Sequence, residues 1–338
     1  MIDGVKRSRL GTQPVGEAAE VAEGVYQLKV PVPIPLVSVS AYLAEGDGGW
    51  TLIDTGFDYP EGRTAWESGA EAIGCNLGRD VERIVVTHFH PDHLGAAYWL
   101  QGISGAPVCM LGSEIEHSRE VWGDPDPAPF IEHLVRSGMG RALAERAAAG
   151  TRADLSLPEK MVPLSVGEEI PLGPGTARIL HAPGHADHQA MLHDEGRGLL
   201  FAADQVMLGV TPNIGRWPDT PPKPLARYLK SLRSIRGLDA DLVLPGHGPL
   251  FHDLRGRADE LLLHHEERLE VMQAEISGAP KTPFEVSQGL PLQPLALRAV
   301  LRAGRDPRPS GTPGPRRPGG AYGGRARLLP GGVIAWSH

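Results

Sequence analysis

Four side chains that commonly bind metal ions lie within six consecutive residues of this chain. They follow the apolar run at 84–86, and they are His88, His90, Asp92 and His93. A strand that ends at Thr87 would place them in a loop at its tip, where imidazoles and carboxylates can converge on an ion without being buried unpaired. Because the whole chain has 14 histidines, this clustering favours a metal site over a solvated histidine-rich turn.

Three later segments repeat the pattern of a strand-like run that leads into a metal-binding side chain. These side chains are His185 in His-Ala-Pro-Gly-His, Asp204 after the apolar run 199–203, and His247 in Leu-Pro-Gly-His-Gly. Glycine and proline beside the two histidines allow the backbone to turn sharply. Each segment taken alone could be a strand-end turn with a polar cap. Together they supply the ligands that the first cluster lacks.

The elements that must position these residues alternate between strands and helices. Strands are predicted by alternating or short apolar runs at 25–30, 38–43, 50–53, 81–87, 177–180, 198–202 and 241–244. Helices are predicted at 62–73, 92–100, 114–120, 129–150, 225–235 and 254–276. Strands interleaved with helices indicate an α/β domain with helices on the outer faces of its sheets.

The ordered motifs resemble those of the metallo-β-lactamase-fold hydrolase superfamily. The matching elements are Ile-Asp-Thr-Gly at 53–56, His-x-His-x-Asp-His at 88–93, Pro-Gly-His at 183–185, Asp204, and Pro-Gly-His-Gly at 245–248. The resemblance extends over residues 25–250. It implies a four-layer αββα sandwich with the metal site along one edge of the two packed sheets.

The same resemblance implies two divalent metal ions and assigns their ligands. His88, His90 and His185 would hold one ion, Asp92, His93 and His247 the other, and Asp204 would bridge both. Asp54 is expected to hold a ligand histidine rather than to bind metal itself. Imidazoles and carboxylates without a thiolate favour zinc, although iron or manganese would also be accepted.

This ligand set predicts a metal-dependent hydrolase with a dinuclear site. Two cations beside one water lower its pKa to about 7, so a metal-bound hydroxide, oriented by Asp92, would attack the substrate. The predicted substrate is a small thioester, ester or lactone, as in the glyoxalase II-like enzymes. Possible substrate contacts are His188, and Arg216 and Trp217 in the proline-rich segment 211–218. The alternatives are a plain polar surface for His188 and an exposed proline-rich connection for Arg216 and Trp217.

Charge and composition separate the alternative functions. The chain has 33 Lys and Arg against 41 Asp and Glu, a net charge of -8, which favours a small-molecule substrate and gives no general attraction to nucleic acid. Residues 254–301 nevertheless resemble the start of the helical or winged-helix-like appendage of one superfamily branch that includes ribonucleases. A phosphodiesterase or ribonuclease is therefore the alternative. A β-lactamase is disfavoured by the absence of a secretory signal, and a non-catalytic binding protein by the intact ligand set.

Three regions are predicted along the chain. They are a catalytic domain at 1–253, a helical, partly winged-helix-like appendage at 254–305, and a disordered tail rich in Pro, Gly and Arg at 306–338. No apolar run reaches membrane-spanning length. Only two cysteines are present, which together with the missing signal favours a cytoplasmic location. The sequence does not indicate an oligomeric state.

Overall fold

A computed structural model of the chain describes residues 7–33, 37–123, 126–151, 155–218, 220–289, 325–329 and 333–337. Contacts between residues divide the chain into two compact units. The first unit consists of Met1–Val32, Leu36–Pro125 and Leu155–Arg268. The second consists of Pro33–Pro35, Asp126–Asp154 and Leu269–His338.

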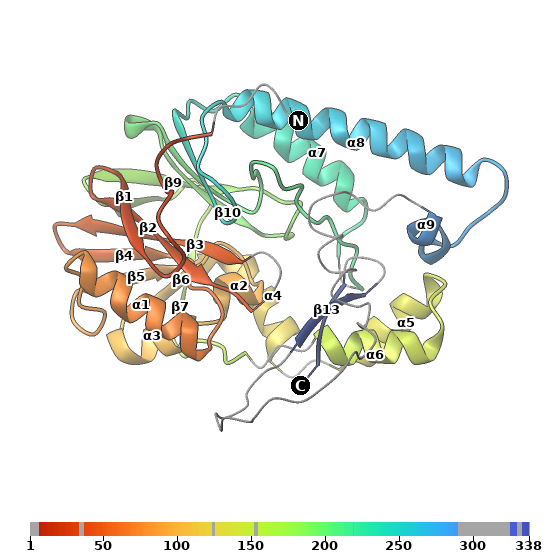
Figure 1. Cartoon of the computed structure of the whole chain (residues 1–338), viewed down its shortest axis with the longest axis horizontal. Coiled ribbons are helices and arrows are strands. Elements are labelled where there is room, and N and C mark those ends of the chain that lie inside the picture. The colour runs from red at the N-terminus through yellow and green to blue at the C-terminus, as the bar shows by residue number, and fades with distance from the viewer. Residues whose placement is uncertain are drawn as a thin grey trace, which may run out of the picture. The chain divides into compact units, whose positions relative to one another are not determined.

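The first unit contains two sheets (Figure 1). One has the order β1 (Ala18–Ala22), β2 (Val25–Pro31), β3 (Ser38–Gly46), β4 (Gly49–Ile53), β5 (Val81–Val85), β6 (Val108–Leu111) and β7 (Met161–Leu164). Its first four strands form an antiparallel meander, and β4 to β7 are parallel. The other has the order β12 (Leu242–Pro245), β11 (Leu199–Ala203), β10 (Ala190–Asp194), β9 (Gly175–His181) and β8 (Glu169–Leu172), with only the β11 and β12 pair parallel.

The two sheets pack face to face, and the alternation of side chains along β11 shows how. Phe201 lies in the cluster between the sheets, where its ring meets Tyr42 of β3 edge-on at 5.3 Å between ring centres. The adjacent Leu200 and Ala202 lie in a different cluster, which includes residues of two helices. Successive side chains of a strand point to opposite faces, so this sheet is covered by the other sheet on one side and by helices on the other.

Helices form the two outer layers. On the first sheet, α1 (Pro60–Ala72), α3 (Ala97–Ser104) and α4 (Gly112–Trp122) contact its strands. On the second, α7 (Pro224–Ile235) and α8 (Leu254–Ile276) contribute Tyr228, Leu232 and Leu261 to the apolar cluster, and Figure 1 shows these two helices running together. The predicted four-layer αββα sandwich is confirmed.

Two helices predicted as continuous are interrupted. The helix expected at 92–100 is divided into α2 (Pro91–Leu94) and α3, because the chain between them bonds to the turn after β4: Thr55 N–H donates to His93 O, and Ala96 N–H to Gly56 O. The helix expected at 129–150 is divided into α5 (Ala128–Arg136) and α6 (Arg141–Thr151). Between them Gly138 adopts a left-handed φ of 97°, which ends the first helix.

The second unit contains a small apolar cluster of its own. Leu134, Met139, Ala144 and Ala147 pack together with Phe284 of α9 (Pro283–Gly289). Thr282 and Glu285 bond reciprocally to each other's backbone N–H at the start of α9, as in a capping box.

Two short strands lie within the segment predicted as a disordered tail, and the prediction for the segment as a whole stays a prediction. Residues Arg325–Leu329 and Val333–Ser337 form the antiparallel pair β13 and β14. The rest of the predicted tail, including 306–324, lies outside the described residues, as does 290–305 of the predicted appendage. The division at residue 253 stays a prediction, and it falls within the first unit.

A buried arginine connects the start of α8 to the segment that follows β11. Arg257 is only 3% exposed. Its guanidinium donates hydrogen bonds to the carbonyl oxygens of Met207 (2.8 Å) and Val210 (2.9 Å) and pairs with Glu260 at 3.0 Å. The first turns of α8 therefore belong structurally to the first unit. Among the described residues, no helix combines the length and apolar character needed to cross a membrane.

His265 of α8 makes the stability of this unit dependent on pH. Its buried ring packs edge-on against Tyr228, and burial, followed by the neighbouring His264, lowers the pKa of His265 to about 4. The ordinary histidine pKa is near 6.5, so between these values the unfolded chain binds the extra proton and the folded state loses stability as pH falls.

We expect His265→Leu to remove this pH dependence. From pH 7 to pH 4.5, the unfolding free energy of the metal-free wild type should fall by about 1–2 kcal/mol more than that of the variant, with screening by water allowed for. Urea denaturation of both proteins at the two pH values measures the difference. An identical pH dependence in the two proteins would contradict a buried neutral imidazole.

Candidate metal centre

The candidate ligands all follow the carboxyl ends of strands. Residues 88–93 follow β5, His185 follows β9, Asp204 follows β11 directly, and His247 follows β12. The strands β4 and β5 are parallel to each other, as are β11 and β12, so the residues that follow each pair emerge at the same edge of their sheet. This arrangement brings segments distant in sequence to one edge of the sandwich.

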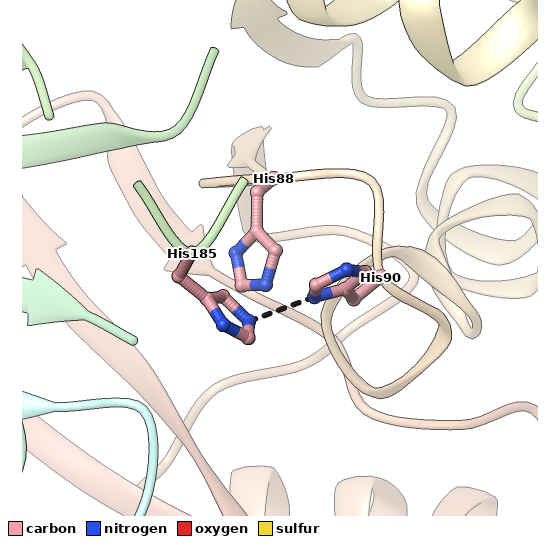
Figure 2. Close-up of side chains that lie close together, drawn as sticks. All are labelled: His88, His90 and His185. Carbon is pink, nitrogen blue, oxygen red and sulfur yellow. Dashed lines mark hydrogen bonds between the residues drawn. The ribbon is translucent and has the colours of Figure 1, made fainter. Parts of the chain in front are cut away.

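His88, His90 and His185 form the first group. One ring nitrogen from each lies within 4.8 Å of the others, and His90 Nδ1 is 2.8 Å from His185 Nε2. The ring of His88 stands edge-on to both neighbours, at 4.7 Å and 5.1 Å between ring centres. Figure 2 shows the three rings, carried by two different loops, turned toward a common point.

Asp92, His93 and His247 form a second group, again with ligand atoms within 4.8 Å. His247 Nε2 lies 3.1 Å from Asp92 Oδ2. Asp204 contacts both groups: its Oδ1 is 3.5 Å from His93 Nε2, and its Oδ2 is 3.5 Å from Nε2 of both His185 and His247. The structure thus brings all seven predicted ligands into one cluster with a single carboxylate between its halves.

Each of three ligand histidines has its second nitrogen held by an oxygen acceptor. His93 Nδ1 lies 2.8 Å from Asp54 Oδ2. His185 Nδ1 and His247 Nδ1 lie 3.0 Å from the carbonyl oxygens of Asn213 and Ser38. A carbonyl oxygen can only accept, so Nδ1 of His185 and of His247 carries a proton and Nε2 of each ring faces the centre.

Asp54 also orders the chain that precedes the ligand loop. Its carboxylate accepts hydrogen bonds from Thr87 N–H at 2.8 Å and from the Thr87 hydroxyl at 2.9 Å. Asp54 is buried and has a left-handed φ of 59°, a conformation that aspartate tolerates better than most residues. Asp54 contacts His93, one of the candidate ligands, and belongs to none of the groups that could hold a metal ion.

Two glycines beside candidate ligands lie so close to neighbouring side chains that a Cβ would collide with them. A Cβ on Gly246 would lie 2.2 Å from Asp204 Oδ1 and 2.8 Å from His93 Cε1. A Cβ on Gly184, whose φ is 154°, would lie 2.3 Å from the Tyr228 ring. Both positions belong to the Pro-Gly-His motifs, so the glycines let the backbone pass where a side chain would collide.

The imidazoles of the two groups differ in their electrostatics. Burial, reinforced by neighbouring imidazoles, lowers the pKa of His88 well below its ordinary value and that of His90 to about 3. Burial also lowers the pKa of His185. For His93 and His247 burial acts in the same direction, but the nearby carboxylates outweigh it and raise the pKa of both.

The carboxylates are held in their charged form. Burial alone would raise the pKa of Asp92 and Asp204, but the neighbouring imidazoles, chiefly His93 for Asp92 and His247 for Asp204, outweigh it and lower both pKa values. Ionised carboxylates are the form that binds cations, and a cation would also displace the proton that the raised pKa values favour on His93 and His247.

Three atoms of the cluster test whether a metal ion fits here. His88 Nε2, His93 Nε2 and Asp204 Oδ1 are buried and have no hydrogen-bond partner within the described part of the chain. An unpaired buried polar atom costs free energy, and three of them converge among ligand-type side chains. A bound cation would satisfy them, so the residues present fit a metal site.

The three predicted substrate contacts lie outside the ligand groups. His188 is half-buried, with its ring 6.1 Å from those of His117 and His181. Arg216 is exposed, and the backbone N–H of Trp217 donates to the Thr220 hydroxyl. The segment 211–218, which contains Arg216 and Trp217, contacts the centre through the carbonyl oxygen of Asn213, which lies 3.0 Å from His185 Nδ1.

Sequence reasoning missed the backbone carbonyls that bond to the candidate ligand histidines. The carbonyls of Ser38 and Asn213 carry no side-chain signal at all. The residue after Asp204 was also missed: the buried Gln205 side chain accepts a hydrogen bond from Gln189 (3.2 Å) and donates one to Ser231 (2.9 Å). The signal that could have identified Gln205 is its position, a polar side chain between Asp204 and the apolar pair 206–207.

An αββα sandwich with a histidine and carboxylate centre at its edge defines a class of metal-dependent hydrolases. The sequence model of the metallo-beta-lactamase superfamily matches residues 34–247, and the chain belongs to this superfamily. Its membership, and relatives named as hydrolases, confirm the predicted enzyme class.

Three similar proteins illustrate the relationship. The probable metallo-hydrolase YqjP of Bacillus subtilis is 27% identical over 288 residues, which cover 79% of this chain and 85% of that protein. A metallo-beta-lactamase family protein from Thermus thermophilus is 33% identical, with a TM-score of 0.72 and coverage of 78% and 86%. A beta-lactamase domain protein from Burkholderia ambifaria is 26% identical, with a TM-score of 0.72 and coverage of 99% and 98%.

We expect Gly246→Ala to disturb the shared carboxylate specifically. The added methyl group would displace Asp204 Oδ1 or the His93 ring, and a misplaced ligand should weaken zinc binding by roughly 10–100-fold. Competition with a chromophoric chelator measures the affinity. Gly237→Ala is a matched control, because a Cβ there meets nothing within 4 Å. Unchanged zinc affinity in Gly246→Ala would show that the site adapts to the extra atom.

Proposed function

We propose that this hydrolase holds two divalent ions, with zinc preferred over iron or manganese, and cleaves small thioesters, esters or lactones. The observation that carries the proposal is the position of Asp204. Its two carboxylate oxygens lie 3.5 Å from histidines of both ligand groups. One carboxylate shared by two groups is an arrangement suited to a pair of ions.

In this proposal His88, His90 and His185 hold one ion, Asp92, His93 and His247 hold the other, and Asp204 bridges them. The donor atoms are imidazole nitrogens and carboxylate oxygens without thiolate sulfur, which suits zinc and is compatible with iron or manganese. Bound divalent ions would act as Lewis acids that polarise the substrate and make a coordinated water more acidic.

Asp92 is the residue that we assign to proton transfer. Its carboxylate is kept ionised by His93 and His247, and its Oδ2 is fixed 3.1 Å from His247 Nε2. An ionised, oriented carboxylate can align the attacking water and accept its proton. Asp54 acts behind it by fixing the ring of His93 through the 2.8 Å contact with Nδ1. No serine or cysteine nucleophile is required.

The preference for a small substrate rests on charge. With a net charge of -8, the chain as a whole repels a polyanion, and nucleic acid would need a local basic patch. Substrate recognition is assigned to the surroundings of the ligand loops, where His188, Arg216 and Trp217 remain the candidate contacts. A phosphodiester is the competing electrophile, and the substrate experiment separates the two.

Replacement of Asp92 should abolish turnover without unfolding the protein. We expect Asp92→Asn to lower kcat by roughly 10²–10⁴-fold, because the amide cannot accept the proton. The exposed Asp47→Asn is the matched control. Steady-state kinetics on zinc-loaded proteins, with circular dichroism as a check of folding, measure the effect. Full activity of Asp92→Asn would refute the assignment.

Metal content and substrate class are tested on the wild type. Elemental analysis of the zinc-loaded protein should give two ions per chain, whereas a value well below one would contradict the dinuclear site. A panel of chromogenic thioester, lactone and phosphodiester substrates then ranks the electrophiles. We expect turnover of the thioester or lactone. If only the phosphodiester is cleaved, the proposed substrate class is wrong while the metal site stands.

A further inference from the structure

The backbone N–H and the backbone carbonyl of one residue both form hydrogen bonds with side chains of a single helix. This residue is Phe89, which lies between His88 and His90. Its N–H donates to Glu114 Oε1 at 2.7 Å, and its carbonyl oxygen accepts from Trp122 Nε1 at 2.9 Å. Both partners belong to α4, which follows β6 and is otherwise remote from the ligand loop in sequence.

The side chain of Phe89 is held against the same helix. It is 8% exposed, and its ring meets His117 edge-on at 4.6 Å and Trp122 at 6.5 Å between ring centres. Residues 114 and 117 are three positions apart and so lie on one face of the helix, and Trp122 is its last residue. Three side chains of α4 thus contact the N–H, the ring and the carbonyl of one residue.

Burying the carboxyl group of Glu114 costs free energy that a side chain with a packing role alone would not require. It is 0% exposed, and its Oε2 has no hydrogen-bond partner in the described residues. Burial raises the pKa of Glu114 to about 8, although the hydrogen bond from Phe89 N–H opposes this rise. An apolar side chain would avoid this cost. We therefore attribute the presence of Glu114 to the hydrogen bond that it accepts from Phe89 N–H.

This set of contacts is separate from the one around Asp54. Asp54 holds Thr87 and His93, on either side of the first histidine pair. No contact of Asp54 fixes the peptide groups between His88 and His90. Because these two ligands are separated by a single residue, rotation of the peptide planes of Phe89 would change the distance and angle between their rings.

We propose that Glu114 and Trp122 are positioning residues for the first ligand group, which clamp the backbone of Phe89 and so set the geometry of His88 and His90 toward His185. This inference rests on the proposed function, since it assigns a metal ion to that group. Because the clamp acts on one group only, its loss should affect one of two metal-binding steps. The clamp does not touch the substrate.

The test is a titration of metal-free protein with Zn²⁺ alone, in competition with a chromophoric chelator. Glu114→Ala removes the acceptor, Trp122→Phe keeps an aromatic ring but removes the donor, and Glu114→Gln keeps an acceptor of the same shape. Glu116→Ala, an exposed residue of the same helix, is the matched control. Substrate turnover is not needed as a readout.

We expect Glu114→Ala and Trp122→Phe to weaken one zinc-binding step by roughly 10–100-fold. Glu114→Gln and Glu116→Ala should stay within about twofold of wild type. Two double variants identify the affected step. The His247→Ala variant keeps the first group intact, and adding Glu114→Ala to it should weaken zinc binding. The His185→Ala variant keeps the second group intact, and adding Glu114→Ala to it should have no effect.

Several results would overturn the clamp. The first is wild-type zinc affinity in both Glu114→Ala and Trp122→Phe. The second is equal weakening of both zinc-binding steps, because this indicates general loosening of the fold. The third is a Glu114→Gln variant that binds zinc as weakly as Glu114→Ala. If Glu114→Ala does not fold, Trp122→Phe decides alone. If the wild type binds a single ion, the dinuclear proposal fails, but the clamp is still judged by whether Trp122→Phe weakens that ion and Glu116→Ala does not.

Discussion

The buried carboxylate of Asp54 is the interaction on which the rest of the centre depends. It closes the end of β4 in a left-handed conformation and receives hydrogen bonds from the backbone and hydroxyl of Thr87 and from the ring of His93. The Thr87 hydroxyl in turn lies 3.0 Å from His88 Nδ1. One carboxylate therefore orients a histidine of each ligand group, and its own burial is made tolerable by the donors that it orders.

The centre is built from groups that a folding protein ordinarily avoids burying together. Clustered imidazoles lower one another's affinity for protons, while carboxylates a few ångströms away act in the opposite direction. Such local conflict is expected at functional sites, where the surrounding structure holds groups in place for a ligand. The two sheets supply that rigidity, because Phe201 and Tyr42 lock the faces whose edge carries the ligands.

The α/β class and the ligands at strand ends could be predicted because each depends on local sequence pattern. Short apolar runs identify β5, β9, β11 and β12, and the candidate ligands lie in the loops that follow these strands. Several strands were missed, among them β10, Ala-Met-Leu-His-Asp, whose apolar run has only three residues before two buried polar residues. Contacts that arise only in three dimensions leave no such trace: the carbonyl of Asn213 looks like any other carbonyl, and Glu114 resembles the exposed glutamates beside it on α4.

The salt-bridged Arg257 has a consequence for how this protein could have acquired its C-terminal part. Its guanidinium satisfies the carbonyls of Met207 and Val210 in the segment after Asp204. A gene fusion that joined two ancestral modules at residue 253 would have left the buried Met207 carbonyl without its donor, at a cost of about 1–3 kcal/mol. In this chain a junction placed beyond Arg257 would avoid that cost, because the first turns of α8 would stay with the segment whose carbonyls they satisfy.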